Sequence, residues 1–415
     1  MSHSKKILTY ILFVFSLLIG LYLNENSSGG SKKDFNVLLP YIETFGKNFK
    51  EGLFFFFDNT ATIIHSPAHY IFLGNLNSFF GNIIITKIFY IFLSSLLPFI
   101  FFLILKKKIN CDLNILFIFS CLIFLSPYFR SSSIWITGDN LALIFFAISI
   151  FFYLNSLKNR EKKLNFFLCC TFLILCCYIR YYYALFILFY FYEFYKELNL
   201  KWKMAIFFYC FIISLPAFAY FYYISINTTF LNTALNYTRL SYFGNLFLIL
   251  SILFFYLFPF IVFNYKKIIN YYSKNYKILI FIFSFLTFFL IIDFLSTKNL
   301  INFSIYGGGV FKKLFEFLNL NIKFSLYILS IISLTVLDYY FKDYRKKNYL
   351  LLLIIIISFP MFTIFQKYFD PLFYFLFFGL ISFKRFDEII DINLKKLLFI
   401  YMYFLFFLIF CIIYY

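Results

Sequence analysis

His65-Ser66-Pro67-Ala68-His69-Tyr70 opens a segment that continues Ile-Phe-Leu-Gly-Asn-Leu-Asn-Ser-Phe-Phe-Gly to residue 81. It belongs to the polar stretch from Asn24 to Asn82, whereas most of the remaining chain is a succession of apolar runs. A connection of this length far exceeds the usual loop, and such loops are typically functional or disordered. Because the stretch alternates polar residues with Phe, Leu and Tyr, we expect it to fold into helices lying on a membrane surface.

The composition excludes an ordinary soluble protein. The 415 residues are 63% hydrophobic, whereas a typical globular domain is about half apolar. The net charge of +19 would suit a nucleic-acid partner, but Lys and Arg stand in short clusters between apolar runs. That distribution is typical of the loops that orient a membrane protein. We therefore expect a lipid bilayer as partner and no nucleic acid.

Thirteen apolar runs approach the length of about 20 residues that a membrane span requires. They lie at about residues 7–23, 84–105, 112–127, 139–155, 164–180, 181–195, 204–225, 244–264, 277–295, 324–341, 348–366, 371–383 and 397–414. No small-residue cleavage site follows the first run, so we expect it to be retained as a helix. The predicted fold class is an all-α polytopic membrane protein whose long first outside loop forms interfacial helices.

Basic residues predict the orientation of these spans. If the N-terminus is cytoplasmic, the inside segments hold 24 of the 37 Lys and Arg residues, and each inside segment carries a cluster. The rule that cytoplasmic loops are enriched in Lys and Arg then places the 24–82 loop outside. The active face would be extracytoplasmic, which is the periplasmic side of the inner membrane if the cell is bacterial.

The two histidines of the outside loop are candidates for chemistry. Pro67 suits the first turn of a helix, which places His65 just before that helix and His69 in its first turns. A metal bound by this pair would need further ligands, which Asp34 and other acids of the loop could supply. The alternative is that either imidazole only forms a hydrogen bond with the loop backbone.

Two further polar positions fall on the same predicted face. Ser126-Pro127 ends one span, and Gly138-Asp139-Asn140 opens the next, where Asp139 could serve merely as a helix N-cap. Arg180 follows an apolar run, and a guanidinium at the depth of the lipid headgroups is well shaped to hold a phosphate. Ordinary snorkelling of the side chain to the interface would also explain an arginine there.

These stretches together resemble the membrane glycosyltransferases of the C-type fold. The likeness is to the branch with protein O-mannosyltransferases, the aminoarabinose transferase of lipid A and the Rgt-type lipopolysaccharide core transferases. In that branch an acidic motif follows span one, and a His-Pro-Pro-Leu-Tyr-Tyr-like helix ends in Phe-Gly before a basic residue, as residues 65–81 and Lys87 do here. Ser126-Pro127, Asp139 and Arg180 fit later features in the same order.

The resemblance implies transfer of a sugar from a polyprenyl-phosphate donor to a glycolipid, polysaccharide or protein acceptor in the cell envelope, with inversion. The family's adjacent acidic pair is absent, and Asp34 takes its place as the implied base, with Glu25 as the rival. The implied site therefore has Asp34, His65 and Glu25 as catalytic candidates. Candidates for binding substrate or phosphate are Arg180, Asp139, His69, Lys312 and Lys313. A divalent metal held by Asp34 and His65 remains open.

The likeness covers about residues 1–225, which predicts a glycosyltransferase-like core there and C-terminal helices of uncertain role at 226–415. Three other classes compete with this interpretation. A polysaccharide polymerase of the Wzy kind would use outside arginines, such as Arg130 and Arg180. A lipid-linked glycan flippase or transporter would need polar residues along its spans, where few occur. A membrane scaffold would not need the 65–81 segment.

Overall fold

The computed structural model describes residues 2–58, 66–158, 162–195, 198–227, 242–295, 307–359, 364–384 and 393–415. Within these ranges the chain is helical and forms no β-strand. It divides into two compact units, residues 1–233 with 401–415, and residues 234–400. Each unit has its own buried apolar core. The division into a catalytic core and C-terminal helices of uncertain role remains a prediction.

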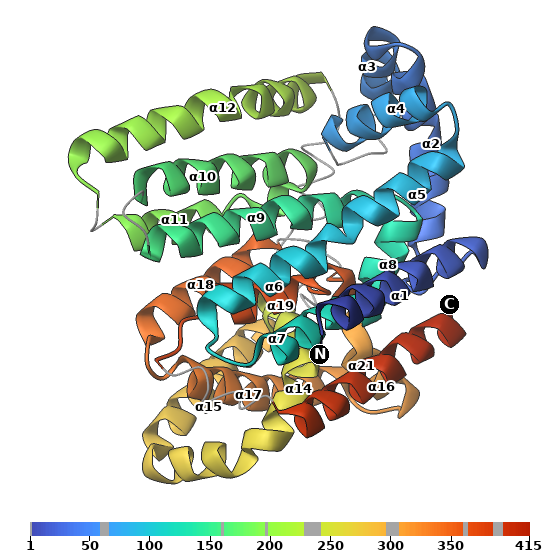
Figure 1. Ribbon diagram of the computed structural model, residues 1–415. Helices are drawn as coiled ribbons and strands as arrows, with labels where there is room; N and C mark the ends of the chain where they lie inside the picture. Colours follow the sequence, from blue (N-terminus) through green and yellow to red (C-terminus); the bar gives the residue numbers. More distant parts are fainter. Residues whose placement is uncertain are drawn as a thin grey trace. The chain divides into compact units, whose positions relative to one another are not determined.

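The first unit contains the α-helices α1 to α12, which are labelled in Figure 1. Its helices are α1 (His3–Tyr22), α2 (Ser31–Lys47), α3 (Phe49–Asp58), α4 (Ala68–Phe80), α5 (Ile83–Ser94), α6 (Leu96–Lys108), α7 (Leu113–Ser120), η2 (Cys121–Leu125), α8 (Pro127–Ile134), α9 (Gly138–Lys158), α10 (Lys162–Ile179), η3 (Tyr181–Tyr183), α11 (Phe186–Phe194) and α12 (Leu200–Asn227). The most extensive packing in this unit joins α9 to α10, which run side by side (Figure 1).

The second unit is built on α14. Its helices are α14 (Tyr242–Lys274), α15 (Tyr276–Leu295), α16 (Gly309–Phe317), α17 (Ile322–Phe341), α18 (Arg345–Ser358), η4 (Gln366–Tyr368), α19 (Leu372–Phe375) and the π-helical η5 (Leu376–Leu380), and α21 (Leu394–Tyr414) continues from it into the residues of the first unit. Ser330 and Ser333 of α17 donate hydrogen bonds to backbone carbonyls of α14. Such small polar residues let two helices approach closely in a membrane.

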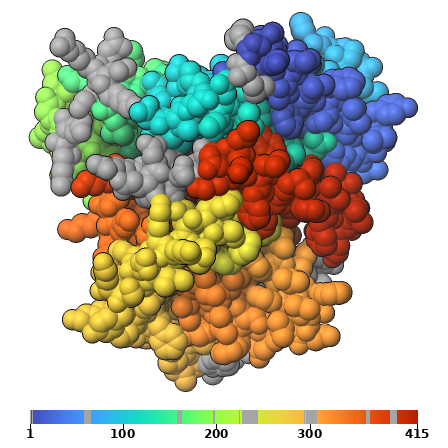
Figure 2. Space-filling view, turned by 60° about the horizontal axis from the view of Figure 1, so that its bottom comes forward, coloured from blue at the N-terminus to red at the C-terminus, as the bar shows by residue number. Residues whose placement is uncertain are grey.

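Seven helical segments among the described residues are long and apolar enough to cross a membrane. They are Ser4–Tyr22, Ile83–Lys108, Gly138–Leu157, Leu200–Tyr223, Gly244–Lys274, Ile322–Phe341 and Leu394–Tyr414. Large apolar side chains are exposed on several of these segments, among them Leu394–Tyr414, which is red in Figure 2. The chain is therefore an all-α polytopic membrane protein, as its composition predicts.

The other predicted spans fall on shorter or bent helices. Leu113–Leu125 and Pro127–Ile134 form a pair bent by 66°, because Pro127 cannot continue the preceding helix and starts a new one. The residues from Pro127 to Ile134, between two predicted spans, form the helix α8. Runs 181–195 and 371–383 are divided into short helices. The count of thirteen spans remains a prediction.

The described part of the predicted outside loop contains the helices α2, α3 and α4. Its helices pack through a shared aromatic cluster, in which Tyr41, Phe45, Phe56 and Tyr70 are all buried. The prediction that this stretch is helical is confirmed for residues 31–58 and 68–80. Its position on a membrane surface remains a prediction.

Candidate functional site

The turn between α8 and α9 is held by hydrogen bonds to three other segments. The Trp135 indole N–H donates to the Glu25 carbonyl at 2.7 Å, and the Tyr90 hydroxyl donates to the Thr137 carbonyl at 2.6 Å. Between them, Nε2 of His69 lies 2.9 Å from the Ile136 carbonyl oxygen. Ile136 has a φ of +46°, a left-handed conformation that is unfavourable for a β-branched residue. These tertiary hydrogen bonds therefore hold a strained turn.

Immediately after this turn, Asp139 pairs with Arg180. Asp139 lies inside the first turn of α9, and Arg180 follows the last residue of α10. Nε of Arg180 is 2.7 Å from Oδ1 of Asp139, and the two side chains are 11% and 25% exposed. The Asp139 carboxylate is thus committed to an ion pair as well as lying at the favourable end of a helix dipole.

The two terminal nitrogens of Arg180 differ from its Nε in their contacts. Within the described part of the chain, no hydrogen bond joins either of them to another residue. A guanidinium held at Nε by a carboxylate presents these nitrogens in a fixed plane. That geometry matches two oxygens of a phosphate or a carboxylate.

Tyr70 connects this pair to the acid of α2. It is almost fully buried, and burial raises the pKa of Tyr70 to about 12. The positive charge of Arg180 opposes this rise in pKa, while Asp34 and Asp139 add to it. One phenol therefore experiences the charges of Asp34, Asp139 and Arg180. Asp34 itself is half-buried in the first turn of α2.

A second cationic group lies next to this turn. Nζ of Lys87 is 3.9 Å from the centroid of the Phe35 ring and 4.4 Å from that of the Trp135 ring. Nζ of Lys32 also faces Trp135, at 5.6 Å. Cation–π attraction stabilises such an arrangement without a carboxylate. The basic residue at the start of the second predicted span is thus fixed between two aromatic faces.

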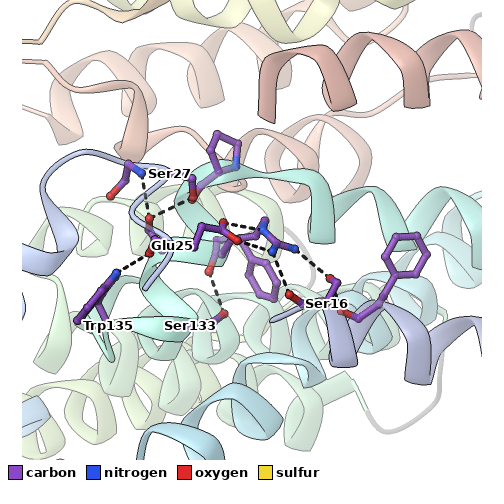
Figure 3. A network of polar contacts seen from close by, with 11 residues as sticks. Ser16, Glu25, Ser27, Ser133 and Trp135 are labelled. Atoms are coloured by element: carbon purple, nitrogen blue, oxygen red, sulfur yellow. Dashed lines mark hydrogen bonds and ion pairs between the residues drawn. The ribbon is translucent and has the colours of Figure 1, made fainter. Parts of the chain in front are cut away.

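The side chain of Glu25, the rival acid, is bound by Arg130 in a network that also includes Trp135 (Figure 3). Arg130 donates from Nε and Nη2 to the two carboxylate oxygens of Glu25, at 2.8 and 2.5 Å. A third hydrogen bond joins Nη1 of Arg130 to the Ser16 hydroxyl at 3.0 Å. Both charged side chains are less than a tenth exposed. This bidentate pair connects the segment after α1 to α8.

The remaining candidates are His65, Lys312 and Lys313. His65 lies outside the described residues. Lys312 and Lys313 belong to α16 of the second unit, where Lys312 is buried and its Nζ is 3.4 Å from Glu316. Among the described residues, no group of three or more His, Cys, Asp or Glu side chains is arranged to hold a metal ion. A metal bound by Asp34 and His65 remains untested.

Sequence reasoning missed the aromatic part of the site. Tyr70 belongs to the quoted segment but had no role in it, Tyr90 lies within the apolar run 84–105, and Trp135 lies between two apolar runs. Their polar tips give a partial signal, because a buried Tyr or Trp usually needs a hydrogen-bond partner. No protein-family model, curated protein or solved structure matches the chain.

Proposed function

We propose that this protein is a membrane glycosyltransferase that uses a polyprenyl-phosphate sugar as donor. The observation that carries the proposal is the Arg180 guanidinium, which Asp139 holds at Nε and whose two terminal nitrogens remain open. A phosphate is the ligand that best fits such a fork. The surrounding spans would accommodate the isoprenoid tail, so that only the phosphate and the sugar need a polar site.

In this proposal the acceptor hydroxyl attacks the anomeric carbon of the sugar from the side opposite the phosphate. The bond between that carbon and the phosphate oxygen breaks, and the lipid phosphate leaves with the bonding electrons. Arg180 neutralises the charge that develops on the phosphate, and Asp34 accepts the proton of the hydroxyl, as general-base catalysis requires. Lys312 and Lys313 remain further candidates for phosphate contact.

The hydrogen-bond pattern favours Asp34 over Glu25 as the base. Both oxygens of Glu25 already accept hydrogen bonds from Arg130 in a pair that is nearly excluded from water. Protonating a carboxylate in that position would break a buried ion pair and leave Arg130 uncompensated, which costs about 3–5 kcal/mol. Asp34 is half-buried and acts electrostatically on the same Tyr70 as Arg180 does.

The same network weakens the polymerase alternative. A polymerase that used outside arginines would draw on Arg130 and Arg180, but the three donor nitrogens of Arg130 are already bound to Glu25 and Ser16. One arginine with open donors suits a single phosphate. The thirteen-span C-type arrangement and the outward orientation of the site belong to this proposal and rest on the resemblance and on the distribution of Lys and Arg.

Farnesyl phosphate is a suitable probe for the phosphate site, with farnesol as the analogue that lacks the phosphate. Affinity should fall in the order wild type, Arg180→Lys, Arg180→Ala, because lysine keeps the charge and loses the two-pronged contact. The complete loss should be roughly 10- to 150-fold, the value of a charge-assisted hydrogen bond. Lys47→Ala removes an exposed charge of the same unit and should leave affinity unchanged. Equal affinity in all four proteins would refute the phosphate site.

A further inference from the structure

The sequence pattern makes His69 a candidate for direct substrate contact, but its hydrogen bond points elsewhere. A carbonyl oxygen only accepts, so Nε2 of His69 must carry the hydrogen that is donated to Ile136. Nδ1 then carries the lone pair. It is buried and has no hydrogen-bond partner among the described residues. The imidazole is 95% buried, since only 5% of its residue surface is exposed.

The His69 ring also packs between the two segments that carry the ion pair. A Cβ atom added to Gly138 would lie 3.4 Å from Cγ and Cδ2 of His69 and 3.1 Å from Cγ2 of Ile179. Gly138 is the residue before Asp139, and Ile179 is the residue before Arg180. The absence of a side chain at Gly138 therefore allows the imidazole and both halves of the ion pair to come together.

The strained residue needs an external hold. Ile136 occupies the left-handed region, which is unfavourable for an L residue with a branched Cβ. Its own carbonyl accepts the hydrogen bond from His69. On one side Thr137 accepts a hydrogen bond from Tyr90, and on the other the Trp135 indole donates one to Glu25. Loss of the His69 donor would leave a buried carbonyl unsatisfied and remove one of three restraints on the turn.

We infer that His69 is a positioning residue: its Nε2–H fixes the Ile136 turn, and the turn fixes Asp139 against Arg180. His69 does not exchange a proton with the substrate in this arrangement. One consequence of this inference, that Arg180 is presented to a phosphate, rests on the proposed function. Its structural part concerns only the Asp139–Arg180 geometry and can be tested without any substrate.

Substitution of His69 by glutamine or asparagine distinguishes the roles of the two ring nitrogens. The glutamine side-chain nitrogen is as many bonds from Cα as Nε2 of histidine, and the asparagine nitrogen as many as Nδ1. His69→Gln therefore keeps the donor to Ile136, whereas His69→Asn loses it. Should His69→Asn fail to fold, judged by its melting temperature in detergent, His69→Phe takes its place because it keeps a ring and removes the donor.

The first readout is the rate at which phenylglyoxal modifies Arg180 in the full-length protein, followed by mass spectrometry of the peptide. We expect His69→Gln to react at the wild-type rate and His69→Asn at least about threefold faster, because Arg180 is released from Asp139. The second readout is farnesyl phosphate affinity, which should stay within about threefold for glutamine and fall at least about tenfold for asparagine. The pH dependence of binding should be the same in His69→Gln as in the wild type.

The outcomes distinguish the two proposals. If neither the wild type nor the variants bind farnesyl phosphate, but Arg180 is modified faster in His69→Asn than in His69→Gln, the positioning role stands and the proposed function fails. If asparagine matches the wild type in both readouts, His69 does not position the turn. If both variants lose phosphate affinity while Arg180 reacts at the wild-type rate, the ring contacts the ligand directly and the inference is overturned.

Discussion

Ionisable residues of the first unit are held by each other and by backbone groups. Arg130 pairs with Glu25 and Arg180 with Asp139, while His69 donates to a carbonyl. All three nitrogens of Arg130 donate hydrogen bonds, to Glu25 and Ser16. In Arg180 only Nε donates one among the described residues. This difference between two arginines of similar burial is the basis on which we propose a phosphate contact for Arg180 and not for Arg130.

His69 should make stability depend on pH. Burial lowers the pKa of its imidazole from the ordinary 6.5 to about 4. Between these two values the unfolded chain binds the proton and the folded chain does not, so stability falls as the pH falls from about 6.5 to about 4. The loss through this one group is about 3 kcal/mol. Thermal unfolding in detergent at pH 7 and pH 5 should show a smaller difference in His69→Gln, and an identical difference would contradict the buried neutral imidazole.

The Glu25–Arg130 pair should be far more sensitive to single than to paired substitution. Glu25→Gln leaves Arg130 charged, buried and uncompensated, which should destabilise the protein by about 3–5 kcal/mol. Glu25→Met with Arg130→Met removes both charges and should cost much less. Glu51→Gln, an exposed acid on α3, is the control. A single substitution no more harmful than this control would mean that the pair is hydrated.

At the scale of helices, α2 and α4 approach through glycines. A Cβ atom on Gly74 would lie 2.6 Å from Cβ of Phe45 and 2.9 Å from the backbone nitrogen of Gly46. Neither atom can move without shifting α2. The close contact joins α4, which carries Tyr70, to α2, which carries Asp34.

Gly74→Ala should therefore destabilise the protein, although alanine is the better helix former. We expect a loss of about 1–3 kcal/mol from overpacking, measured by unfolding in detergent. Gly30→Ala is the matched control, because nothing lies within 4 Å of its added Cβ and its φ is negative. That change should be neutral or stabilising by up to about 1 kcal/mol. Equal effects at both glycines would contradict the close helix contact.

Features that depend on neighbouring residues in the sequence could be predicted, whereas those that depend on tertiary contacts could not. Pro67 and Gly81 bracket α4 because their backbone preferences are intrinsic, and long apolar runs become helices wherever they occur. The conformation of residues 135–137 could not be predicted, since isoleucine is a poor residue for a positive φ. Only the tertiary hydrogen bonds from His69, Tyr90 and Trp135 explain it. The Asp139–Arg180 pairing required the packing of α9 on α10 and was likewise not readable from either segment alone.

For the molecule as a whole, the proposed site must face the side on which lipid-linked sugars are used. Lys47→Cys and Lys107→Cys, each in a chain lacking its eight native cysteines, would report the two sides to a membrane-impermeant maleimide in intact cells. The basic clusters predict labelling at position 47 and protection at position 107 until the membrane is permeabilised. Labelling of both from the same side would refute the orientation.

The central claim is tested most directly by mass spectrometry of the envelope glycans after deletion of the gene. One glycan should lose a single sugar, and the wild-type gene should restore it. Asp34→Asn should not restore it at equal protein abundance, because loss of the base lowers turnover by roughly 10²- to 10⁴-fold. Three results would contradict the account: an unchanged set of glycans, shortened polymers in place of a missing sugar, or full restoration by Asp34→Asn.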